Sequence, residues 1–424
     1  MISTPHDAES AEPSLLRRAR LPAWLLPDAW PRDGGDPLLA DIGIEQGRVA
    51  SIAPSGVWPE AREPAHWDLA GAPVLPAMVD AHTHLDCAFT RGRIADLQPG
   101  LLAGIAAKAA DRVNWTEHDL RRRAQQALGW AFDAGTAVLR SHVDWLDAAE
   151  VPTAWSVFGE LAAEWAGRVR LERVSLCQPR LHADRYGAQR LARQVAASPG
   201  GASVGSFMHT SNWNRDAVRH LFEAAADWGL QVDLHVDEEL DPGAQGLAFV
   251  ARLLREMKFE GRVVCGHNCA LSAQSESTAL ATLDAVAQAP ITLVSLPQNN
   301  LLLQDAVTGR TPRWRGITLL KEARARGIPL LIASDSVQDP FCAVGSFDPV
   351  EAFAAGVLAG QLDQPFDRWS DTICRSDWLR AAPASMPLGV GEPCDLVIFY
   401  AASASAWPSR AHPRTVLRHG RKWA

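Results

Sequence analysis

The sequence predicts an α/β fold, a TIM-type (β/α)8 barrel with a small β-domain built from both chain termini. Three observations predict it. Eight short apolar runs lie between Met78 and Ser334, helical segments separate most of them, and segments of β-like texture lie at both ends of the chain. Alternating strands and helices favour a parallel sheet or barrel. Eight such units over about 250 residues are what a (β/α)8 barrel requires.

The eight runs are short and mostly apolar, which is typical of parallel strands buried on both faces. The expected strands are Met78–His82, Thr136–Val143, Val169–Cys177, Ser203–Met208, Leu230–Val236, Arg262–His267, Ile291–Leu296 and Pro329–Ser334. Expected helices include Glu117–Ala134, Arg215–Trp228, Ala244–Lys258 and Thr278–Ala289. The run Ala72–Val79 also has the character of one fully buried strand. We expect the barrel domain to span residues 73–384.

The small β-domain is expected to combine residues 15–72 with residues 385–424. Pro37–Ile44 and Glu45–Ala53 have the pattern of a hairpin that turns near Gly47. Near the other end, Cys394–Tyr400 and Thr415–Lys422 have the same texture. Residues 1–14 are polar and acidic, and we expect them to be disordered.

Composition narrows the class of protein. The chain has 424 residues, 47% hydrophobic and 21% charged, with a formal net charge of −8. No basic run could follow a phosphate backbone, and no run approaches the 18 apolar residues of a membrane span, so neither nucleic acid nor a membrane is an expected partner. Seven scattered cysteines without a Cys-x-x-Cys pair are expected to be free thiols in a reducing, cytoplasmic compartment. A homo-oligomer is compatible with the sequence.

Polar side chains collect at the carboxyl ends of the expected strands. These ends carry His82 and His84; Arg140, His142 and Asp144; Gln178; His209; His235, Asp237 and Glu238; His267; and Asp335. The carboxyl ends of barrel strands meet at the face where barrel active sites lie. The sequence therefore predicts an active site built from these side chains.

The chemistry of these side chains predicts a catalytic metal site. His82 and His84 point the same way because strand side chains alternate. With His235 and the carboxylate of Asp335 they form a ligand set that leaves positions open for water and substrate. Glu238 can then move a proton from water to the leaving group, and His267 can donate to that water. Arg140, His142 and Asp144 could equally form a purely structural polar network.

Five segments resemble the amidohydrolase superfamily, and within it the cytosine deaminase family with its N-isopropylammelide hydrolase relatives. They are Val79–Asp86, Leu139–Asp144, Leu234–Glu238, Cys265–His267 and Ser334–Pro340. The resemblance implies that His82, His84, His235 and Asp335 bind one Fe(II) or Zn(II) ion. It also implies that Glu238 shuttles the proton, that His267 orients the hydrolytic water, and that Gln178 binds the carbonyl and ring-nitrogen edge of the substrate.

Two positions depart from that family. The chain has Ser336 after the metal aspartate where the family has an acid, and Phe341 where the family has tryptophan. Both positions border the substrate in the family, so we expect a bulkier ring, or one with a substituent on that edge, in place of cytosine. Asp237 and His209, beside their strand ends, complete the expected substrate contacts.

The expected function is hydrolytic deamination of a cyclic amidine or nucleobase-like ring, in which metal hydroxide attacks the C–NH2 carbon and ammonia leaves. The alternatives are hydrolysis of an N-alkylamino triazine of the N-isopropylammelide type and deamination of isoguanine or a pterin. A third hypothesis is a barrel that binds a small ring without catalysing a reaction. Glu238 argues against it, because binding alone needs no proton shuttle.

Overall fold

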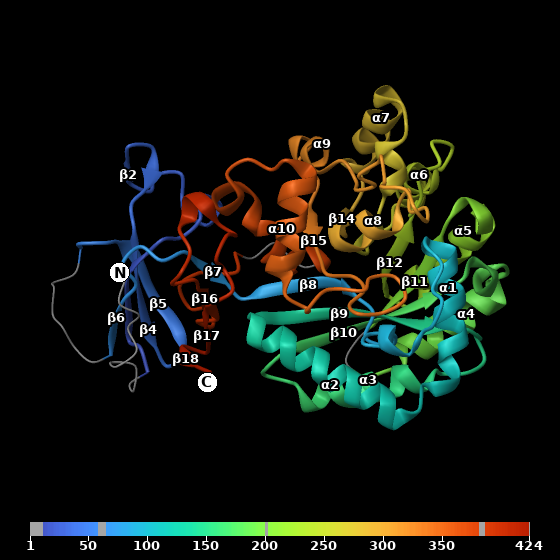
Figure 1. Cartoon of the computed structure of the whole chain (residues 1–424), viewed down its shortest axis with the longest axis horizontal. Coiled ribbons are helices and arrows are strands. Elements are labelled where there is room, and N and C mark those ends of the chain that lie inside the picture. The colour runs from blue at the N-terminus through green and yellow to red at the C-terminus, as the bar shows by residue number, and fades with distance from the viewer. Residues whose placement is uncertain (1–11, 58–64, 200–201, 381–385, 424) are drawn as a thin grey trace.

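The computed structural model of the chain describes residues 12–57, 65–199, 202–380 and 386–423. Figure 1 shows two parts, a barrel surrounded by helices and a pair of small sheets beside it. Both chain ends lie on the side of the small sheets. Residues 1–11 of the segment expected to be disordered lie outside the described residues.

The barrel is an eight-stranded sheet in the order β15-β14-β13-β12-β11-β10-β9-β8. Its strands are β8 (Met78–Thr83), β9 (Thr136–Trp145), β10 (Arg170–Cys177), β11 (Ala202–Met208), β12 (Gln231–Val236), β13 (Val263–His267), β14 (Ile291–Ser295) and β15 (Leu330–Ile332). All neighbouring strands are parallel. A parallel bridge between Thr83 and Asp335 brings the first and last strands together, and the Asp335 amide donates to the His82 carbonyl (2.8 Å). The predicted (β/α)8 barrel is confirmed.

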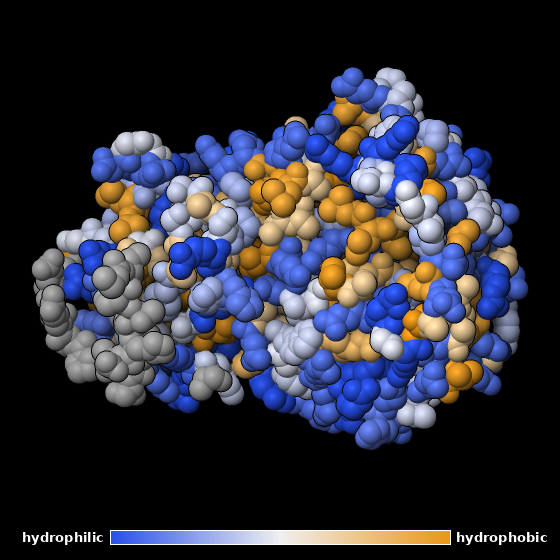
Figure 2. All heavy atoms as spheres, viewed as in Figure 1, coloured by the Kyte–Doolittle hydropathy of each residue, from blue (hydrophilic) through white to orange (hydrophobic). Residues whose placement is uncertain are grey.

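Ten α-helices are described, and most of them cover the outside of the barrel (Figure 1). They are α1 (Leu101–Asp111), α2 (Glu117–Ala134), α3 (Thr153–Glu164), α4 (Arg185–Ala196), α5 (Arg215–Asp227), α6 (Gly246–Met257), α7 (Glu276–Val286), α8 (Pro297–Leu303), α9 (Leu320–Ala325) and α10 (Pro349–Gly360). Figure 2 shows hydrophilic residues over α2 and α3 and apolar residues gathered over α8 and α10.

The predicted bounds of α2 agree with the structure because both of its ends carry strong signals. The Thr116 side chain accepts from the Asp119 amide at the start, and Gly135 ends the helix with a left-handed φ of 102°. A hydroxyl at the N-cap and a glycine just past the last turn are the usual helix boundaries. The helix buries an alanine- and leucine-rich face against the barrel.

The two small sheets combine strands from both ends of the chain, as predicted. One contains N-terminal strands, and the other joins one N-terminal strand to three strands near the C-terminus. One has the order β5-β4-β1-β6 and the other β18-β17-β16-β7. Their strands are β1 (Leu15–Ala19), β4 (Ala40–Glu45), β5 (Arg48–Pro54), β6 (His66–Asp68), β7 (Val74–Pro76), β16 (Leu396–Ile398), β17 (Thr415–Arg418) and β18 (Arg421–Lys422), and a separate two-stranded ribbon pairs β2 (Arg32–Asp33) with β3 (Asp36–Pro37). One apolar core contains residues of both sheets, among them Leu16, Ile42, Leu396 and Leu417. The hairpin turning at Gly47 is confirmed by the pairing of β4 with β5, while the exact domain limits stay a prediction.

The prediction that Ala72–Val79 forms one buried strand is wrong. Its first part, β7, pairs with β16 of a small sheet, and its last two residues begin barrel strand β8. Between them the Ala77 amide donates to the Asp395 carbonyl (2.9 Å), and the Met78 amide donates to the Gly135 carbonyl (3.0 Å). One apolar run thus joins the two parts of the molecule. Its hydropathy cannot show that its first half pairs with a small sheet and its last residues with the barrel sheet.

Two expectations from composition can also be compared with the structure. All seven cysteines are buried free thiols, as expected. Within the described ranges, no helix is long and apolar enough to cross a bilayer.

Gly135 offers a test of the contact between the barrel and the small sheets. Its φ is 102°, and a Cβ there would lie 2.4 Å from Val397 Cγ2. Gly167 has a φ of 83° but open space around it. Gly135→Ala should lower the free energy of unfolding by about 2–4 kcal/mol, because strain and a clash add, and Gly167→Ala by about 1 kcal/mol from strain alone. Urea unfolding measures the stability of both variants. Equal losses of stability would show that the close approach to Val397 adds no cost at Gly135.

Candidate active site

Three imidazoles converge at the carboxyl end of the barrel. His82 comes from β8, His84 follows directly after β8, and His235 comes from β12. The Nε2 atoms of His82 and His84 each lie 3.1 Å from Nε2 of His235. Burial, and then the neighbouring imidazoles, lower the pKa of His82 and of His235 well below its ordinary value. These two shifts favour the neutral ring in His82 and His235, which is the state in which imidazole binds a metal.

Asp335 completes this group from just beyond β15. Its Oδ1 lies 3.3 Å from Nε2 of His84 and 3.8 Å from Nε2 of His82. Burial would raise its pKa, but the hydrogen bond with His84 and the nearby histidines outweigh burial, so the pKa of Asp335 lies below its ordinary value. Its Oδ2 is buried without a hydrogen-bond partner among the described residues.

These donors fit a divalent metal ion. Nitrogen atoms 3.1 Å apart suit ligands that share one ion at about 2.0–2.1 Å. Neutral imidazoles and an ionised carboxylate with an unpartnered oxygen are the donors that Zn(II) and Fe(II) take.

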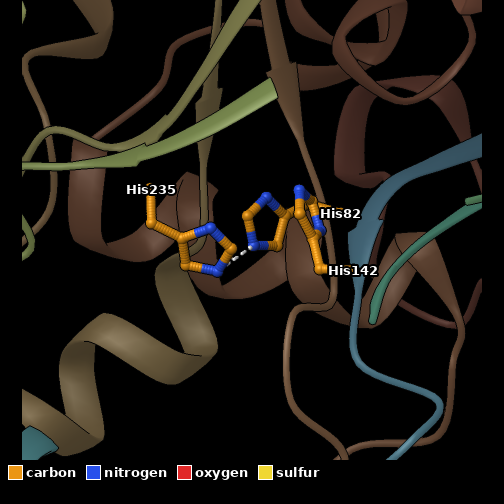
Figure 3. Close-up of side chains that lie close together, drawn as sticks. All are labelled: His82, His142 and His235. Atoms are coloured by element: carbon orange, nitrogen blue, oxygen red, sulfur yellow. Dashed lines mark hydrogen bonds between the residues drawn. The ribbon is translucent and has the colours of Figure 1, made fainter. Parts of the chain in front are cut away.

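His142 also approaches this group. Ligand atoms of His82, His142 and His235 lie within 4.8 Å of one another (Figure 3), and so do those of His82, His267 and Asp335. The His142 ring packs on His82 with centroids 3.9 Å apart, but its Nε2 lies 3.1 Å from Asp233 Oδ1. Asp233 thus holds His142 through Nε2, while the buried Nδ1 of His142 has no hydrogen-bond partner among the described residues.

Glu238 and His267 lie together beside the imidazoles. Glu238 Oε1 is 3.3 Å from His267 Nδ1, and the Asn300 side-chain amide is 3.1 Å from the same nitrogen. Burial, with the charges of Asp335 and Glu239, raises the pKa of Glu238 well above its ordinary value. Burial lowers the pKa of His267 to about 4. Two neighbouring carboxyl groups whose pKa values are pushed in opposite directions are suited to different roles, one in proton transfer and one as a charged ligand.

The backbone turns sharply where three of these strands end. Asp237, His267 and Asp335 have φ values of 52°, 70° and 61°, in the left-handed region that residues other than glycine seldom adopt. Such strain costs about 1–3 kcal/mol per residue and is concentrated at functional sites. Here it directs His267 and Asp335 toward one point.

A pocket opens directly above this group. Its cavity of about 90 Å³ has two kinds of lining. Polar side chains at one end include His84, His235, Glu238, His267 and Asp335, and the walls include Trp145, Leu146, Leu176, Phe207 and Phe341. A mostly apolar cavity with a few convergent polar groups is typical of a small-molecule site.

Comparison with known proteins decides the family. A sequence model described as "Amidohydrolase family" matches residues 190–421. A pterin deaminase from Rhizobium rhizogenes is 37% identical over 386 residues, which cover 90% of this chain and 87% of the relative. The chain belongs to the amidohydrolase family.

Solved structures show the same fold for this amidohydrolase. The 5-methylcytosine deaminase from Klebsiella pneumoniae, liganded with phosphonocytosine, has a TM-score of 0.80 at 23% identity and covers 97% of this chain and 98% of its own. N-isopropylammelide isopropylaminohydrolase from Burkholderia multivorans has a TM-score of 0.70 at 23% identity, with 96% and 97% covered. The resemblance inferred from sequence is confirmed. The amidohydrolase is a metal-dependent hydrolase of C–N bonds, with buried groups that could hold the metal.

Three of the five expected substrate contacts line the pocket of the amidohydrolase. They are Gln178, Ser336 and Phe341. The Gln178 Oε1 accepts from the Asn212 side-chain amide (2.7 Å), which leaves its own NH2 group to donate toward a ligand. Asn212 itself was not anticipated from sequence.

The other two contacts lie outside the pocket lining. Asp237 accepts from the amides of Gly246 and Leu247 (both 3.0 Å) and so caps the start of α6. His209 caps a short 3₁₀ turn by accepting from the Ser211 amide (3.1 Å), and its ring packs on Phe207. Both side chains thus serve helical turns that begin at the rim.

Beneath the imidazoles lies a buried polar network. Arg140 binds Asp233 (2.8 Å) and Glu172 (2.7 Å), and Asp233 in turn holds His142. Asp144, on the same face of β9, lies higher and lines the pocket. Arg140 and His142 therefore belong to the network and Asp144 to the pocket, because alternate residues of a strand occupy successive layers of the barrel interior. Sequence reasoning missed both Asp233 and Glu172.

Removal of Arg140 should destabilise the protein strongly. The Arg140 side chain is 3% exposed, whereas Arg170, which pairs with the same Glu172, is 47% exposed. Arg140→Met leaves the fully buried carboxylate of Asp233 with His142 as its remaining partner and should cost about 3–5 kcal/mol, although Glu172 keeps Arg170 and Arg380. Arg170→Met should cost at most about 1 kcal/mol, as a surface pair does. Denaturant unfolding compares them, and similar losses would mean that Arg140 is not needed to balance the buried acids.

Proposed function

We propose that the chain is a deaminase of pterin-like rings, in which a fused ring amidine loses its amino group as ammonia. The geometry that supports this is the convergence of His82, His84, His235 and Asp335 beneath one pocket beside Glu238. The 37% identity with a pterin deaminase over 90% of this chain supports the substrate class.

The proposed metal site holds one divalent ion, Zn(II) or Fe(II). His82, His84 and His235 supply nitrogen and Asp335 supplies oxygen. An ion in such a site acts as a Lewis acid and makes water a stronger nucleophile at neutral pH.

The protein side chains then move the protons. Water oxygen forms a bond to the C–NH2 carbon and the C–N bond breaks. One water proton leaves with the amino nitrogen as ammonia, and the other ends on the ring nitrogen of the oxo product. Glu238 takes one proton on its carboxylate and delivers it to the ring or to the departing amine. His267, 3.3 Å from Glu238 and held by Asn300, orients the attacking water.

The walls support a flat ring larger than cytosine. Phe341 and Phe207 offer aromatic faces, and Gln178 offers its amide to a carbonyl or ring nitrogen. Ser336 takes less room than an acid at this wall and carries no charge. A pocket with these walls accommodates a second fused ring.

A substrate panel tests the proposal. Ammonia release is measured for pterin, isoguanine, cytosine and an N-alkylamino triazine with the purified, metal-loaded protein. Pterin should give the highest kcat/KM, at least about 10²-fold above cytosine, because unpaired polar groups penalise the wrong ring. Cytosine turnover at or above about 10⁵ M⁻¹s⁻¹ would contradict the proposed ring. Release of an alkylamine from the triazine, with no ammonia from the other three rings, would instead support an N-alkylamino triazine hydrolase.

A further inference from the structure

One face of α1 forms a wall of the pocket that the sequence did not reveal. Leu101, Ile105, Lys108 and Arg112 all line the cavity. Their spacing of four, three and four residues places them on one side of a helix. This face is apolar at its start and cationic at its end.

The helix is seated closely against the opposite wall. A Cβ on Gly104 would lie 2.7 Å from the Phe341 ring, and the Lys108 ammonium lies 5.9 Å from the centre of that ring. Lys108 is 5% exposed. The cations are thus built into the pocket.

Asp144 joins the two cations but does not use all of their donors. Lys108 Nζ is 2.8 Å from Asp144 Oδ1, and Arg112 Nη2 binds Asp144 Oδ2. An ammonium has three N–H donors and a guanidinium has five. Among the described residues, the buried Nε of Arg112 has no hydrogen-bond partner.

Lys108 stays charged beside its acidic neighbours, so its remaining donors can bind an anion. Burial opposes the charged form of Lys108, but Asp144 and then Asp86 outweigh it and raise its pKa, so the ammonium persists. Asp86 lies behind the wall, fully buried, with its Oδ2 3.9 Å from Lys108 and accepting from the Asp144 amide. The pocket lining contains the two cations, the carboxylate of Asp144 beside them, and the carboxylates of Glu238 and Asp335 at the end of the pocket where the imidazoles lie.

We propose that Lys108 and Arg112 form a subsite for an anionic substituent, a carboxylate, carried by the ring that is deaminated. This inference rests on the proposed function and narrows its substrate to rings with an acidic group. Lys108 and Arg112 donate to the carboxylate, while Leu101 and Ile105 contact the apolar part of the ligand. The competing role for the two cations is a clamp that only fastens α1 to β9 through Asp144.

Two substrates that differ only in a carboxylate distinguish these two roles. We compare kcat/KM for pterin and pterin-6-carboxylate in the wild type, in Lys108→Met and in Arg112→Gln. Calorimetric Kd values for the matching 2-oxo products give a readout that does not depend on turnover. The wild type should favour the carboxylated ring by about tenfold or more, and each variant should reduce that ratio by about tenfold, as expected for a lost charge-assisted hydrogen bond. Arg121→Gln, on the outer face of α2, is the control that should leave the ratio unchanged.

Each outcome decides one claim. A wild-type ratio near one, or equal losses on both rings in Lys108→Met and Arg112→Gln, would overturn the subsite and leave a structural clamp. Pterin turnover would persist in that case, so the proposed function would stand. If neither ring releases ammonia, the proposed function itself fails.

Discussion

Asp335→Ala or His82→Ala should remove metal and turnover together. In each variant a four-donor group loses one member, and the remaining donors cannot hold the ion in the same geometry. Metal content should fall from about one ion per chain to a small fraction, and kcat/KM should fall by about 10³-fold or more. Elemental analysis and ammonia release on the same samples measure both quantities.

His182→Ala is the matched control for loss of a buried histidine. His182 is 1% exposed but lies in the 3₁₀ turn Pro179–His182, outside the pocket lining. It should lower stability without lowering the metal content of the folded protein. Full metal in His82→Ala or Asp335→Ala would remove that residue from the proposed ligand set.

Glu238→Gln should separate proton transfer from metal binding. The amide keeps the size of the side chain but cannot accept and return a proton. Turnover should therefore fall by about 10² or more while metal stays bound. Steady-state kinetics with elemental analysis of the same preparation checks this result.

Glu239→Gln is the neighbouring control. Its carboxylate accepts from the amide and the hydroxyl of Thr210 (2.7 and 2.5 Å) and lies outside the pocket lining. Its loss should affect turnover by less than about tenfold. If Glu238→Gln keeps near-normal turnover, another group moves the proton.

Much of the barrel could be predicted because local sequence and tertiary structure agree there. Buried parallel strands must be apolar on both faces, so polar residues at their ends stand out, as His82, His235 and Asp335 do. Strand alternation then placed His82 and His84 on one side correctly.

The other residues of the site could not be predicted, because their positions depend on contacts that leave no signal in the local sequence. Asp237 lies two residues beyond His235, yet its left-handed φ ends the alternation and turns its carboxylate to α6. Lys108 lies in α1 and Arg112 directly after it, and α1 contacts Phe341, which is far away in sequence. Asp233 needs a charged partner on another strand, which no single-strand pattern reveals.

Turnover of pterin in ¹⁸O-labelled water tests the central claim, hydrolytic deamination in this pocket, most directly. The account predicts one ammonia released and one labelled oxygen in the product for each ring consumed, and loss of both signals in Glu238→Gln. Product without the label, or a consumed ring that still carries its amino group, would contradict it.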